Sequence, residues 1–129
     1  MTPGTEEALI LPLAAPNATL ERVGGKGAAL ADLAVAGFPV PPGFQITTAA
    51  YREFVAANGL QPTIASGMRD LLPDDPTSVQ HVSTVIRDAF LAGVIPEPIA
   101  AEIARAYAAL GEPAVAVRSS ATAEDLPDV

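Results

Sequence analysis

Apolar and polar residues follow a helical spacing over most of this chain. Five stretches place apolar residues three and four positions apart, and each is closed by glycine, proline or asparagine. The pattern therefore predicts about five helices, over residues 26–36, 47–59, 63–72, 76–93 and 97–110.

Three shorter apolar runs lack this spacing and predict strands. They cover residues 8–13, 44–47 and 114–117. The last run, Ala114-Val115-Ala116-Val117, is unbroken, as in a strand that is covered on both faces, and it leads directly into polar residues. Open α/β sheets bind ligands at the ends of such strands. The predicted fold class is α/β (α+β), a small sheet with about five helices.

Length and composition exclude several classes of function. The 129 residues suit one ordinary domain, and the net charge of −8 is the wrong sign for binding a nucleic-acid backbone. The absence of cysteine excludes disulfides, thiolate metal sites and a cysteine nucleophile. The N-terminal residues form neither a signal peptide nor a membrane-spanning helix, so we expect a cytoplasmic protein without nucleic-acid or membrane partners.

A glycine motif precedes the first predicted helix. Gly24 and Gly25 permit close backbone approach, and the positive end of a helix favours an anion such as phosphate. The motif is not a Walker A loop, because Leu20 and Gly27 stand where that loop needs glycine and serine or threonine. Lys26, the only lysine, falls in the first helical turn, where the helix dipole disfavours a cation. It is either a phosphate ligand or an exposed lysine at a glycine hinge.

A second candidate cluster follows the run at 114–117. The guanidinium of Arg118 and the hydroxyls of Ser119, Ser120 and Thr122 suit phosphate oxygens. The alternative is an ion pair between Arg118 and one of the acids that follow, Glu124 or Asp125.

The remaining polar residues favour structural interpretations. Glu124, Asp125 and Asp128 are interpreted as a solvated loop, so no metal ligand is assigned. His81 lies off the apolar stripe of its helix and is interpreted as a surface residue, while Asp74 and Asp75 suit a turn and a helix cap. No catalytic residue is expected in this chain.

Two segments carry a family resemblance. VGGKGAALADLAVAGFPVPPGFQITTAAY, residues 23–51, and AVAVRSSATAEDLPD, residues 114–128, resemble the N-terminal nucleotide-binding region of the phosphoenolpyruvate-utilising dikinases. This family includes phosphoenolpyruvate synthase, pyruvate phosphate dikinase and the rifamycin phosphotransferases. The form VRSSATAEDLP looks like the branch of phosphoenolpyruvate synthase and rifamycin phosphotransferase.

The resemblance implies the first subdomain of an ATP-grasp fold, with residues 1–129 as the incomplete N-terminal part of the nucleotide-binding domain. It implies that Lys26 and Arg118 contact ATP phosphates. The other residues expected around the phosphates are Gly24, Gly25, Ser119, Ser120 and Thr122. Mg²⁺ would accompany ATP, with its ligands outside this chain. The expected partners within the parent protein are the second ATP-grasp half and a swivelling histidine domain.

The resemblance also implies a reaction for the parent protein. A phosphoryl group would pass from ATP through a histidine on another domain to pyruvate. A rifamycin-type antibiotic is the alternative acceptor, and a truncated, non-catalytic interaction or regulatory module is the alternative role. An apolar face left where the second half would pack predicts self-association.

Overall fold

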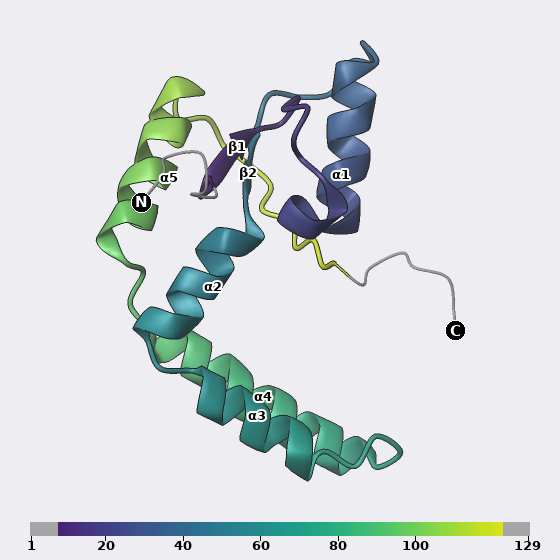
Figure 1. Ribbon diagram of the computed structural model, residues 1–129, viewed down its shortest axis with the longest axis vertical. Coiled ribbons are helices and arrows are strands. Elements are labelled where there is room, and N and C mark those ends of the chain that lie inside the picture. Colours follow the sequence, from purple (N-terminus) through teal and green to yellow (C-terminus); the bar gives the residue numbers. More distant parts are fainter. Residues whose placement is uncertain (1–7, 123–129) are drawn as a thin grey trace. The chain divides into compact units, whose positions relative to one another are not determined.

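The computed structural model describes residues 8–122, which form two compact units. The first consists of the described residues up to Tyr51 and from Glu97 onward, and the second is Arg52–Pro96. The elements in chain order are β1 (Ile10–Pro12), α1 (Leu20–Val35), β2 (Phe44–Ile46), α2 (Thr48–Ala57), α3 (Gln61–Asp70), α4 (Pro76–Ala92) and α5 (Glu97–Ala109) (Figure 1).

The first unit is built around a two-stranded antiparallel sheet. β1 pairs with β2 so that Leu11 lies opposite Gln45. The side chain and the backbone of the buried Thr47 extend this link, since its Oγ1 donates to the carbonyl of Ala8 at 2.6 Å and its N–H donates to that of Leu9 at 3.0 Å. A small buried cluster packs beside β1 and α1, and its members are Leu11, Ala15, Ala18, Val23 and Ala31. The alanines let the backbones of this unit approach closely.

The second unit contains the hairpin of α3 and α4. Gly67 allows the close packing of these helices, because a Cβ built there would lie 3.2 Å from both Val82 Cγ1 and Ile86 Cδ1. The rings of Phe54 and Phe90 stack with their centroids 5.6 Å apart.

The five predicted helices are confirmed, and the fold is mixed α/β with a small sheet. The prediction of a buried strand at 114–117 is wrong. These residues have no regular secondary structure and are exposed, with Val117 90% exposed. Within residues 8–122, the sheet joins only β1 to β2. An apolar run becomes a strand only where another strand offers it backbone partners, and no described segment does so.

The cap of α4 agrees with the prediction for the acids before it. A carboxylate oxygen of Asp75 accepts a hydrogen bond from the N–H of Thr77 at 3.0 Å, and Pro76 occupies the first helical turn. The preceding acid, Asp74, has no such contact among the described side-chain hydrogen bonds.

Replacing Asp75 with alanine should therefore lower the free energy of unfolding by about 0.5–2 kcal/mol, the usual value of such a cap. Urea titration followed by circular dichroism measures this change. Asp74→Ala is the matched control, since it removes the same charge one residue earlier. Equal losses in the two variants would show that the cap contributes nothing beyond charge.

No helix within the described part of the chain is both long enough and apolar enough to cross a bilayer.

Candidate functional site

Helix α1 is broken at a glycine. Gly24 has φ 77° and ψ 176°, a conformation that is essentially restricted to glycine, between a first turn that starts at Leu20 and the helix that continues to Val35. Sequence periodicity predicts a helix from Lys26 with the glycine pair before it. The structure adds the turn before the break and keeps Lys26 in the first turn after it.

The segment 118–122, called the strap below, reaches this break (Figure 1). Ser120 Oγ donates to the carbonyl of Val23 at 2.6 Å and accepts from the N–H of Gly27 at 3.0 Å. The N–H of Gly25 donates to the carbonyl of Ala121 at 3.0 Å. The two motifs identified in the sequence are thus in direct contact, although more than 90 residues separate them in the chain.

The contact depends on the missing side chain of Gly24. A Cβ built there would overlap Ser120 Oγ and lie 2.6 Å from the Ser120 carbonyl carbon, closer than real atoms approach. A glycine at position 24 therefore permits both the sharp turn of the backbone and the close approach of the strap.

The two candidate cations are close in the chain to the residues that make these contacts. Lys26 stands between Gly25 and Gly27, which both donate to the strap, and Arg118 lies two residues before Ser120. Lys26, Arg118, Ser119 and Thr122 are all exposed. Two cations and two exposed hydroxyls near the start of a helix have the chemistry that suits a phosphate group.

Several polar groups that the sequence suggests as phosphate donors form hydrogen bonds within the protein instead. The N–H groups of Gly25 and Gly27 are used within the protein, so they are not the unpaired helix donors that the sequence suggests. The hydroxyl of Ser120 is likewise engaged with backbone on both its donor and acceptor sides. Attraction of an anion rests here on Lys26, Arg118 and the positive end of the helix.

Sequence reasoning missed one residue of this arrangement. Gln45, on β2, is 9% exposed, and its Nε2 donates to the carbonyl of Gly27 at 2.9 Å. The available signal is a glutamine inside a short apolar strand, since a buried amide is costly unless it is hydrogen-bonded. No motif marks such a position in a single sequence.

The acids proposed as alternative partners of Arg118, or as a metal cluster, lie outside the described residues. These are Glu124, Asp125 and Asp128. Among residues 8–122, no group of three or more acids and histidines is gathered as a metal site would require.

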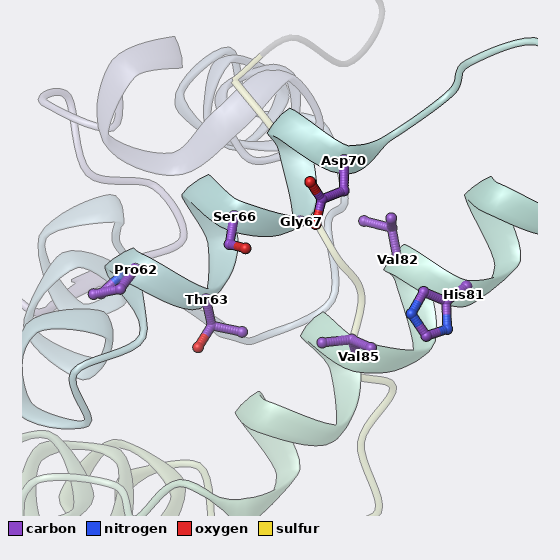
Figure 2. A pocket seen from close by; sticks show the side chains of 8 residues that line it. All are labelled: Pro62, Thr63, Ser66, Gly67, Asp70, His81, Val82 and Val85. Atoms are coloured by element: carbon purple, nitrogen blue, oxygen red, sulfur yellow. The ribbon is translucent and has the colours of Figure 1, made fainter.

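An open groove in the second unit is a separate place where a ligand could lie. Figure 2 shows Thr63, Ser66 and Asp70 of α3 and His81 and Val85 of α4 around it. His81 is exposed, in agreement with its interpretation as a surface residue. None of the seven residues predicted to surround phosphate lines this groove, and neither lysine nor arginine is among its lining residues, so it is poorly suited to a polyanion.

The contact between a cationic helix start and a hydroxyl-rich strap is consistent with a nucleotide-binding class of protein. Residues 20–129 match the family model of the pyruvate phosphate dikinase AMP/ATP-binding domain. The chain belongs to this family.

Curated relatives include two phosphoenolpyruvate synthases and one antibiotic-modifying enzyme. A probable phosphoenolpyruvate synthase from Methanothermobacter thermautotrophicus is 44% identical, over 81% of this chain and 16% of its own length. The phosphoenolpyruvate synthase of Pseudomonas aeruginosa is 43% identical, over 84% of this chain and 15% of its own length. Rifampicin phosphotransferase of Streptomyces sviceus is 44% identical, over 81% of this chain and 12% of its own length. The chain thus spans less than a fifth of the length of these relatives.

Proposed function

We propose that this chain binds the phosphates of ATP at the break in α1 and the strap. The observation that carries the proposal is the direct seating of Ser120 and Ala121 on the backbone of residues 23–27. This contact holds the backbone of Gly25 and Gly27, on either side of Lys26. It also holds Ser120 and Ala121, two and three residues after Arg118. Their side chains would neutralise and position phosphate oxygens, which is the main task of protein groups in phosphoryl transfer.

The other predicted residues would take supporting roles. Gly24 and Gly25 let the strap approach, Ser119 and Thr122 present exposed hydroxyls to the phosphates, and Ser120 contributes through the backbone that it holds. The residues present fit ATP by charge and by donor chemistry.

The wider assembly is also a proposal. Residues 1–129 would form the first part of an ATP-grasp nucleotide-binding domain, with the second half and the Mg²⁺ ligands supplied outside these residues. The greater length of the relatives supports this division. The exposed apolar side chains of Val115 and Val117 would then lie where further chain packs, and they offer a route to self-association. The cytoplasm, where ATP is plentiful, would be its location.

For the parent protein we propose a phosphoenolpyruvate synthase-like reaction. A P–O bond of ATP breaks as an N–P bond forms on a histidine of another domain, and the remainder of the nucleotide leaves with the bridging oxygen. The N–P bond then breaks as an O–P bond forms on the enol oxygen of pyruvate, whose methyl group gives up a proton to solvent or to a base in the rest of the protein. The similarity to two phosphoenolpyruvate synthases supports this acceptor. None of the groups described here is required to transfer a proton, so this chain contributes binding and orientation.

A rifamycin-type antibiotic is the second candidate acceptor. It is favoured by the 44% identity to rifampicin phosphotransferase, which equals that to the first synthase. We place the distinction between the two acceptors in the rest of the parent protein, because the contacts within residues 8–122 that carry the proposal concern phosphate alone.

The whole protein, incubated with radiolabelled ATP and Mg²⁺, tests both acceptors. We expect ATP-dependent phosphohistidine that is discharged by pyruvate, with phosphoenolpyruvate as product. Discharge by rifampicin alone would favour the second candidate. ATP binding without any phosphohistidine would favour a non-catalytic module.

A further inference from the structure

We infer that Gln45 is a positioning residue for the nucleotide phosphates, acting through Gly27. This inference rests on the proposed function of the site. Gln45 is not one of the seven residues predicted to surround the phosphates. It lies on β2 and binds the carbonyl of Gly27, whereas the strap binds the N–H of the same residue.

Gly27 is held at both of its backbone polar groups. Its carbonyl accepts from Gln45 Nε2 at 2.9 Å, and its N–H donates to Ser120 Oγ at 3.0 Å. Ser120 passes the connection on to the carbonyl of Val23, before the break. The chain on the C-terminal side of Lys26 is therefore fixed by β2 and by the strap together.

The fit between Gln45 and Gly27 is also steric. A Cβ built on Gly27 would overlap Gln45 Oε1 and lie 2.9 Å from Val23 Cβ. The amide of Gln45 therefore occupies the space that a larger residue at position 27 would need. A side chain at position 27 would therefore displace the amide of Gln45.

Burial explains why this role calls for glutamine. At 9% exposure, an apolar side chain of the same length would bury its surface without desolvating an amide. Packing alone therefore gives no reason for a glutamine on β2. Its hydrogen bond to Gly27 orders the backbone next to Lys26 before the ligand arrives, which raises affinity by lowering the cost of ordering on binding.

The test compares Gln45→Met with Gln80→Met in the whole protein, in which the proposed second half of the nucleotide-binding domain is present. Methionine keeps the length of the side chain and removes its hydrogen bonds, and Gln80 is an exposed glutamine on α4. Calorimetry measures the Kd for Mg-ATP, and a thermal melt measures stability. We expect Gln45→Met to raise the Kd by about threefold to tenfold, the range that one neutral hydrogen bond produces. Its melting temperature should fall by several degrees, because the carbonyl of Gly27 loses this buried partner, while the protein stays folded at the temperature of the titration. Gln80→Met should change neither quantity.

Gly27→Ala provides a second approach, because it displaces the amide of Gln45 without altering that residue. It should weaken Mg-ATP binding as well. Amide exchange by NMR shows whether the N–H of Gly27 loses protection in each variant. Faster exchange at Gly27 together with a raised Kd, in a folded protein, supports the positioning role.

Three results would overturn it. Unchanged Mg-ATP affinity in folded Gln45→Met removes the role of Gln45 and leaves the proposed function standing. A raised Kd that follows only from unfolding of Gln45→Met and Gly27→Ala shows that the glutamine is structural. Failure of the wild-type whole protein to bind Mg-ATP overturns the proposed function, and the positioning role with it.

Discussion

Lys26→Ala should raise the Kd for Mg-ATP at least about tenfold and leave the fold intact. Hydrogen bonds to charged groups contribute about 1.5–3 kcal/mol, which corresponds to roughly a 10-fold to 150-fold change in affinity. The side chain is exposed and outside the buried cluster of α1, so its loss creates no cavity. Calorimetry gives the affinity, and circular dichroism checks the helix content.

Arg105→Ala is the control for this variant. Arg105 is an exposed cation on α5, in the same compact unit, and its removal changes the net charge by the same amount. We expect it to bind Mg-ATP almost as the wild type does. An equal loss of affinity in both variants would mean that net charge, and not the position of Lys26, governs binding. Arg118→Ala should behave like Lys26→Ala if the strap contributes its guanidinium.

Gly24→Ala should release the strap. A non-glycine residue in the backbone conformation of Gly24 costs about 1–3 kcal/mol, and its Cβ also overlaps Ser120. The loss in the free energy of unfolding should therefore exceed the cost of the backbone conformation alone. Urea unfolding measures the stability, and amide exchange at Gly25 and Gly27 measures the strap contact itself, because both N–H groups donate to it.

Gly37→Ala separates the two causes. Gly37 follows α1 with φ 91°, but a Cβ there would meet no atom within 4 Å. In this variant the free energy of unfolding should fall only by the cost of the backbone conformation, and the amides of Gly25 and Gly27 should still exchange slowly. Protected Gly25 and Gly27 amides in Gly24→Ala would contradict the proposed seating of Ser120.

The parts of the fold that the sequence predicts well are those with local causes. The start of α4 follows from Asp75 and Pro76, and its end follows from Gly93, all within one helix. The glycine pair predicts a helix that starts at Lys26, whereas the structure begins α1 with a turn at Leu20–Val23, which is too short to show a helical period. Local patterns thus locate helices better than they locate short turns.

The features that sequence reasoning missed depend on distant contacts. The run at 114–117 has the composition of a strand, but pairing requires a neighbouring backbone that a local pattern cannot reveal. Gln45 carries no motif, and its role emerges only when β2 and α1 are placed together. Lys26 and Arg118 are candidates from the sequence because each lies in a distinctive motif, whereas the use of Ser120 as an internal link is visible only in the structure.

An NMR titration of the chain with Mg-ATP tests where the nucleotide binds. Shifts are expected at the amides of Gly24, Gly25, Gly27, Ser119 and Thr122, with little change at Gly67 and His81 in the groove of α3 and α4. Shifts confined to that groove would contradict the assignment of the break in α1 and the strap as the nucleotide site.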